Sequence, residues 1–225
     1  MNLKIVLMVA VLVIILLAVA FTVRGKNKMV NDAKNEKTVM TALTSDSTGE
    51  YVIDVTQSTV TWSASKTLIA NYTDTGTIGV DGNSFTLENG EIKSGSVTIN
   101  MDTIVALNTG RNVGMEGLTK HLKSADFFDV AQFPTAEFVI TKVTKSDATN
   151  VIVDGNLTIK GITQPISFPA ELGLENEAVR LRAEFQLDRT LWQIKYGSGK
   201  FFQDLGDKII DDMFTLKLDI VGVKK

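Results

Sequence analysis

Cysteine is absent from this chain of 225 residues, and histidine occurs only once, as His121. Without cysteine there is no disulfide, thiolate zinc site, iron–sulfur cluster or cysteine nucleophile. A single histidine also excludes any metal site that takes two imidazoles from one chain. The formal net charge is −3, without the basic surplus that nucleic-acid-binding domains usually carry. We therefore expect no metal and no nucleic-acid partner.

Charged residues are missing from one long apolar run, residues 5–23. A helix of that length rises about 28 Å, close to the hydrocarbon thickness of a bilayer. Residues 1–24 are therefore predicted to form an N-terminal transmembrane anchor. A cleaved signal remains the alternative, because Ala18-Val19-Ala20 reads as a small-x-small cleavage site.

The residues after this run are polar. Residues 25–49 are rich in Lys, Asn, Thr and Ser, a composition that predicts a linker, with the folded domain at 50–225. Lys4 precedes the apolar run, whereas Arg24, Lys26 and Lys28 follow it. On the positive-inside rule these flanking charges would keep the domain in the cytoplasm, so they oppose export.

From residue 51 onward, apolar and polar residues alternate with the period of two that half-buried strands show. The runs 180–187 and 214–220 are the clearest. Turn signals such as Asp81-Gly82-Asn83 and Glu88-Asn89-Gly90 separate the runs. Eight or so short strands predict an all-β antiparallel sandwich or barrel.

The interval 110–129 departs from this alternation. Met115, Leu118, Leu122 and Phe127 follow a mixed helical spacing. We expect a short helix or helical turns that cap one end of the strand structure.

The positions that the alternation turns inward are apolar and carry no charge. Large aromatic side chains there favour a filled core. Small residues favour a tunnel for a slender hydrocarbon; these are Ala64, Ala136, Gly155, Ala170 and Ala183. Two functions follow from the same pattern: a ligand-binding barrel, or a structural or interaction protein with a side-chain-filled interior.

No catalytic set stands out among the polar residues. Ser124 and Asp126 follow His121 closely, but a catalytic triad is a spatial relation with an oxyanion hole, and no nucleophile elbow is present. We therefore expect a protein that is not an enzyme and has no catalytic residues.

Three groups of residues are interpreted as surface features: a pair of arginines, a glycine motif and an acidic cluster. Arg180 and Arg182 fall on the outer face of a strand and are expected to be solvated. Gly197-Ser198-Gly199 is read as a flexible connection. The spacing of the acidic cluster does not fit a calcium loop and indicates a solvated loop. The cluster consists of Asp204, Asp207, Asp211 and Asp212.

The segment 121–130 (HLKSADFFDV), followed by 133–138 (FPTAEF), resembles the signature of the YceI-like family. Further similar stretches occur in the family's order and extend the resemblance over about 51–225; they are 51–62, 155–163, 189–190 with 195–199, and 221–225. One departure is Gln57, where members often carry histidine in the early strand.

The resemblance implies an extended, antiparallel, eight-stranded lipocalin-like barrel that holds a polyisoprenoid or quinone-like lipid and performs no reaction. It also implies export to the bacterial cell envelope, on the periplasmic or extracellular face. Besides that lipid no cofactor is expected, and the partners are the lipid, the membrane through the N-terminal helix, and a second copy of the chain at an exposed barrel edge.

The candidate binding residues form two groups. The apolar sleeve is predicted from the inward positions Trp62, Phe85, Phe138, Leu157, Phe168, Ala183, Phe185 and Phe214. A lipid head group is expected to meet His121, Arg111 and Lys123 at the barrel mouth, the alternative being that His121 packs the cap. Phenylalanine in place of Ala183 or Gly155 is expected to block lipid uptake and to leave the fold largely intact.

Overall fold

The computed structural model of the chain describes residues 39–108 and 114–225. The predicted anchor, most of the predicted linker and Arg111 therefore lie outside the described residues. Within the described ranges, no helix is long and apolar enough to cross a membrane.

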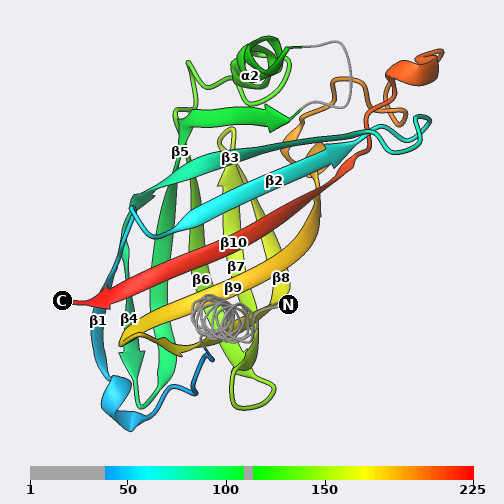
Figure 1. Cartoon of the computed structure of the whole chain (residues 1–225). Coiled ribbons are helices and arrows are strands. Elements are labelled where there is room, and N and C mark those ends of the chain that lie inside the picture. Colours follow the sequence, from blue (N-terminus) through cyan, green and yellow to red (C-terminus); the bar gives the residue numbers. More distant parts are fainter. Residues whose placement is uncertain (1–38, 109–113) are drawn as a thin grey trace, which may run out of the picture. The chain divides into compact units, whose positions relative to one another are not determined.

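Ten antiparallel strands form a single sheet in the described part of the chain (Figure 1). Inward and outward side chains alternate along them as the sequence pattern predicts; in β9, for example, Val179, Ala183 and Leu187 are buried. The strands are β1 (Gly49–Ile53), β2 (Thr59–Ser65), β3 (Thr73–Gly82), β4 (Ser84–Glu88), β5 (Glu91–Asn108), β6 (Thr135–Lys145), β7 (Asn150–Ile159), β8 (Ile162–Glu175), β9 (Ala178–Asp188) and β10 (Met213–Lys224).

The sheet closes into a barrel because β5 pairs with β6. Two short strand pairs share the gap between β5 and β10. Near one end, β2 pairs with 214–219 of β10 and β3 pairs with 98–108 of β5. Towards the other end, β1 pairs with 222–224 of β10 and β4 with 91–95 of β5. Each level of the barrel is thus eight strands round, which confirms the eight-stranded barrel and excludes the sandwich.

A short helix covers one end of the barrel, which we call the α2 end (Figure 1). Helix α2 (Met115–Lys123) packs on β5, where the Ala106 amide donates to Thr119 Oγ1 at 2.9 Å. Leu122 is the buried residue of the helix, and turns follow the helix as far as Gln132. The expected cap is therefore confirmed, as a helix of nine residues followed by turns.

Residues 40–48 pack at the opposite end of the barrel, and we call them the N-terminal plug. Met40 and Leu43 are buried there. Thr41 forms a two-way backbone bridge with Leu174 of β8, at 2.9 and 2.7 Å. Gly173 permits this approach, because a Cβ atom at that position would lie 2.3 Å from the Thr41 carbonyl oxygen. The end of the stretch expected to be a linker thus packs as part of the barrel domain.

The turn between β1 and β2 is organised by the Asp54 carboxylate. It accepts hydrogen bonds from the Thr56 amide at 2.9 Å, the Thr56 hydroxyl at 2.7 Å and Gln57 Nε2 at 2.6 Å. These bonds favour the ionised carboxylate and lower the pKa of Asp54 to about 2. Gln57 therefore lies in a turn rather than in a strand, and its side chain stabilises that turn.

Asp54 is expected to stabilise the fold at neutral pH and to lose this effect in acid. Its folded pKa of about 2 lies below the unfolded value of about 3.9, so the contribution is complete above that value and disappears as the pH falls towards 2. Asp54→Asn should lower the urea midpoint more at pH 6 than at pH 2.5. An equal difference at both pH values would contradict this assignment.

Candidate functional site

The barrel interior holds two cavities with apolar linings. The upper cavity, nearer the α2 end, has a volume of about 130 Å³ and lies between Trp62, Leu157 and Phe214, with Leu122 of α2 in its wall. The lower cavity has about 70 Å³ and is bordered by Phe85, Phe138 and Phe168. A cavity of roughly 150 Å³ in another protein accommodates benzene, so each of these admits a ring or a few carbon atoms in the present conformation.

Three phenylalanines gather where the two hydrophobic clusters of the barrel interior meet; we call Phe138, Phe168 and Phe185 the aromatic partition. Phe168 stacks on Phe185 with ring centroids 4.1 Å apart and planes 7° from parallel, and Phe138 lies 5.7 Å from Phe168. Phe138 and Phe185 pack against both hydrophobic clusters of the core. The interior is therefore neither solid nor one open tunnel: it holds two small cavities, and aromatic rings pack where its two clusters meet.

All eight residues of the predicted sleeve contribute to this interior. Trp62, Leu157 and Phe214 line the upper cavity, and Phe85, Phe138 and Phe168 line the lower one. Phe185 belongs to the partition, and Ala183 is buried in the lower cluster. Their binding role stays a prediction.

Gly155 is unsuitable for the blocking substitution that its inward position suggests. The Phe138 ring covers it, so a Cβ atom there would lie 2.2 Å from the ring and 2.7 Å from the Val139 carbonyl oxygen. The backbone atom cannot rotate away as a side chain could. The expectation that phenylalanine at position 155 leaves the fold intact is wrong.

The predicted head-group residues are engaged within the cap. His121 Nε2 lies 3.0 Å from Asp126 Oδ2, and the imidazole meets the rings of Phe127 and Tyr196 edge-on at 4.9 and 4.6 Å. Lys123 Nζ donates to the Asp102 carbonyl. Neither residue borders the upper cavity. This geometry matches the alternative in which His121 packs the cap, and contact with a head group stays a prediction.

Arg189 is the residue that the inward pattern missed. It borders the upper cavity with only 5 % of its surface exposed, so the expectation of an inward face without charge is wrong. The signal was present, because the alternation 181, 183, 185, 187 continues to 189.

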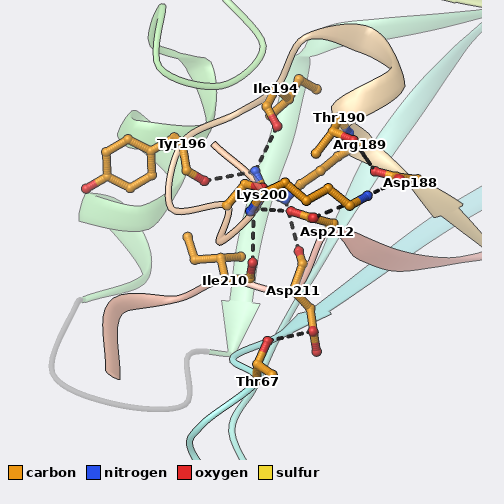
Figure 2. A network of polar contacts seen from close by, with 11 residues as sticks. Thr67, Asp188, Arg189, Thr190, Ile194, Tyr196, Lys200, Ile210, Asp211 and Asp212 are labelled. Carbon is orange, nitrogen blue, oxygen red and sulfur yellow. Dashed lines mark hydrogen bonds and ion pairs between the residues drawn. The ribbon is translucent and has the colours of Figure 1, made fainter. Parts of the chain in front are cut away.

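The guanidinium of Arg189 is fully committed to neighbouring backbone (Figure 2). It donates to the carbonyls of Ile194 and Tyr196, both at 2.8 Å, of Asp211 at 2.9 Å and of Ile210 at 3.1 Å. Burial lowers the pKa of Arg189 and nearby Asp212 opposes that shift, yet an arginine stays protonated. Arg189 therefore joins 194–196 to 210–212 and has no free donor for a ligand.

Two of the acidic residues expected in a solvated loop belong to the same network. Asp212 lies 3.4 Å from both Arg189 Nη2 and Lys200 Nζ. Asp211 Oδ1 accepts from Thr67 Oγ1 at 2.7 Å, which ties the β2–β3 connection to the β9–β10 connection (Figure 2). The solvated interpretation is wrong for these two residues, because their partners come from segments far away in the sequence.

The two outer arginines are likewise paired. Arg180 Nε lies 2.5 Å from Asp219 Oδ1, and Arg182 Nη2 lies 2.6 Å from Glu175 Oε2. These ion pairs connect β8, β9 and β10, so the expectation of solvated arginines is wrong. Over residues 39–108 and 114–225, no group of three or more acidic or histidine side chains is arranged to hold a metal ion.

The two tryptophans of the chain differ in one hydrogen bond, which permits a matched comparison. Trp192 Nε1 donates to the Leu157 carbonyl at 3.1 Å, whereas buried Trp62 Nε1 has no acceptor among the described residues. Trp192→Phe should lower the free energy of unfolding by about 0.5–1.5 kcal/mol more than Trp62→Phe, because only Trp192 loses an indole hydrogen bond. Urea denaturation checks this; equal losses would contradict it.

Comparison with known proteins agrees with the barrel. The model of the YceI-like domain matches residues 51–222. A UPF0312 protein of Enterobacter sp. (strain 638) is 39 % identical over 77 residues, which cover 34 % of this chain and 36 % of that protein. Protein YceI of Salmonella arizonae is 38 % identical over 77 residues, with the same two shares. The aligned part spans about a third of the length of these curated relatives.

Solved structures show the same fold at low sequence identity. BcnA of Burkholderia cenocepacia aligns with a TM-score of 0.59 at 18 % identity, over 76 % of this chain and 99 % of that one. A polyisoprenoid binding domain from Saccharophagus degradans, implicated in plant cell wall breakdown, aligns with a TM-score of 0.56 at 12 % identity, over 78 % and 98 %. With the family match over residues 51–222, these findings show that the chain belongs to the YceI-like family.

Proposed function

We propose that this protein binds a long isoprenoid or similar amphiphilic lipid inside its barrel, and sequesters or transports it without chemical change. The observation that carries the proposal is the pair of apolar cavities in the barrel interior, with the aromatic partition packed where the two hydrophobic clusters meet. Burial of apolar surface contributes about 25 cal/mol per Å², so a prenyl chain along this path would bind tightly with few polar contacts. The similar barrel from Saccharophagus degradans, a polyisoprenoid binding domain, supports this ligand class.

The lipid is proposed to pass through the α2 end. Leu43 of the N-terminal plug packs in the lower cluster at the other end, whereas the upper cavity reaches the cap. Each cavity admits only a short piece of chain, so a long chain must turn the partition rings aside and join the two cavities. The partition would then determine how much of a prenyl chain enters the lower cavity.

Phe168→Leu is expected to shift the bound lipid towards longer chains. The smaller side chain opens the partition between the cavities, at a cost of roughly 1–3 kcal/mol in stability from lost packing. Organic extraction and mass spectrometry of the co-purified lipid measure the chain length. Leu172→Val is the control, because Leu172 borders the lower cavity, belongs to the lower cluster and makes no ring contact with the partition. The same shift in both variants would contradict a role of the partition.

The residues around the cavities support a binding role rather than catalysis. Arg189 is the single charged residue among the described side chains that border either cavity, and carbonyls occupy its donors. A nucleophile with a partner base is not among the residues that border them. The proposed location is the bacterial envelope, where the predicted anchor would hold the barrel close to the bilayer that supplies the lipid.

Native mass spectrometry tests this function. A chain beginning at residue 39, which keeps the N-terminal plug, would be purified gently from a bacterial host. A discrete lipid near one-to-one stoichiometry with a five-carbon mass series is the expected result. A clean protein mass that persists after incubation with prenyl lipids and quinones would overturn it. That outcome favours the alternative, an interaction protein of the envelope, which the small size of the two cavities supports.

A further inference from the structure

Exposed apolar side chains gather at the α2 end. We call six of them the apolar rim; each is 43–62 % exposed, and they are Leu68, Leu107, Met115, Phe201, Phe202 and Met213. They come from the β2–β3 connection, the end of β5, the start of α2, and the β9–β10 connection with the first residue of β10. Large exposed apolar side chains gathered around one opening are typical of an interaction surface.

The segments that carry the rim are fastened to one another. Thr67 Oγ1 donates to Asp211, which joins the β2–β3 and β9–β10 connections. Tyr196 packs against His121 and Phe127, which joins the β9–β10 connection to the cap. The segments that carry the rim are therefore held together at the α2 end.

The two phenylalanines of the rim lie at the tip of a tight turn. The amides of Phe201 and Phe202 both donate to the carbonyl of fully buried Ser198, at 3.2 and 3.1 Å. Arg189 holds the start of the same loop through the Tyr196 carbonyl (Figure 2). Adjacent aromatic side chains, each about half exposed, are thus presented to solvent by a fixed backbone.

A lysine accompanies one of the rim aromatics. Lys195 Nζ lies 4.8 Å from the centre of the Phe201 ring. Lysine beside an aromatic ring suits the bilayer interface, where the ring enters the lipid and the ammonium stays at head-group level. Asp204 and Asp207 lie in the same loop, so the surface is mixed in charge and its apolar side chains must supply most of the affinity.

We propose that the apolar rim docks on the surface of a lipid bilayer and places the mouth of the barrel against it. This inference rests on the proposed function, because a lipid taken from a bilayer would then pass into the upper cavity without crossing water. Phe201 and Phe202 enter the interfacial region, and Lys195 beside the Phe201 ring meets the head groups.

Single cysteines test the docking, since the chain has none of its own. The full chain carrying Phe202→Cys or Val139→Cys would be labelled with an environment-sensitive dye and reconstituted in phosphatidylcholine vesicles with nitroxide-labelled lipids. Val139 is the control, an exposed apolar residue on the outer wall of β6. We expect lipid quenching several-fold stronger at position 202 than at 139. Equal quenching overturns the proposal, as does self-quenching at 202 without lipid quenching, which would indicate pairing of two copies.

A functional variant separates docking from binding. Phe201→Ser with Phe202→Ser in the full chain should slow the transfer of a polyprenol from vesicles roughly tenfold, while the lipid bound at equilibrium stays unchanged. Circular dichroism and the melting temperature check that the variant folds. A label at 202 that stays in water while lipid still binds refutes the docking alone. A label that reaches the bilayer while the barrel remains empty refutes the proposed function alone.

Discussion

Arg189→Met is expected to lower the free energy of unfolding by about 3–5 kcal/mol, the cost of breaking one partner out of a buried charged network. The substitution leaves the carbonyls of Ile194, Tyr196 and Ile210 without their donor in a site where Arg189 is 5 % exposed. Arg189→Lys cannot rescue the loss, because an ammonium does not reproduce the planar fork that reaches two segments together. Urea denaturation followed by circular dichroism measures the change.

The control is Lys225→Met on the barrel surface. Lys225 also forms an ion pair, with Glu50, but the two side chains are 66 % and 46 % exposed and solvent screens the interaction. We expect a loss below about 1 kcal/mol for this control. Hydrogen exchange should also rise over residues 193–212 in Arg189→Met and stay unchanged in the control. Equal destabilisation in both variants would contradict the role assigned to Arg189.

Ala136→Phe is expected to reduce lipid occupancy at least tenfold and leave the barrel folded. Ala136 is buried on β6 beside its strand partner Ile99, and both border the upper cavity, so the added ring would occupy space that the ligand needs. Overpacking should cost roughly 1–3 kcal/mol, less than a typical domain's total stability. Native mass spectrometry gives the occupancy, and thermal melting confirms the fold.

Ala183→Phe provides the comparison for the lower half of the barrel. Ala183 is buried in the lower cluster, so the substitution should cost similar stability but exclude only chains long enough to pass the aromatic partition. Phenylalanine at the exposed position Ala131 should change neither property. A folded Ala136→Phe protein with undiminished lipid would show that the upper cavity is not the binding site.

The strands of the barrel wall, and the side chains that face its interior, could be predicted from the sequence. The alternation of apolar and polar residues is a local consequence of strand geometry, so Leu181, Ala183, Phe185 and Leu187 could be assigned to the interior before any pairing was known. The break in the alternation located the cap, because its spacing changes from two towards that of a helix. The YceI-like stretches, in their order, then selected a barrel over a sandwich.

Other features depended on contacts between distant segments. Only the folded chain showed that β1–β4 and β2–β3 share one gap in the barrel, and that residues 40–48 pack as a plug. Arg180 and Arg182 looked solvated because their partners, Glu175 and Asp219, lie on neighbouring strands. Pairing of this kind joins residues up to 39 positions apart for Arg180 and Asp219, and no local pattern records it.

The division of the interior is the clearest case. The sequence by itself determined that aromatic and small side chains face inward, and it could not choose between a core and a tunnel. The tertiary structure decided for two cavities, because the rings of Phe138, Phe168 and Phe185 come from three strands and meet at one level. It likewise turned Arg189 towards carbonyls of segments that follow it in the chain. Side-chain identity is local information, whereas the space between side chains is set by the register and closure of the whole barrel.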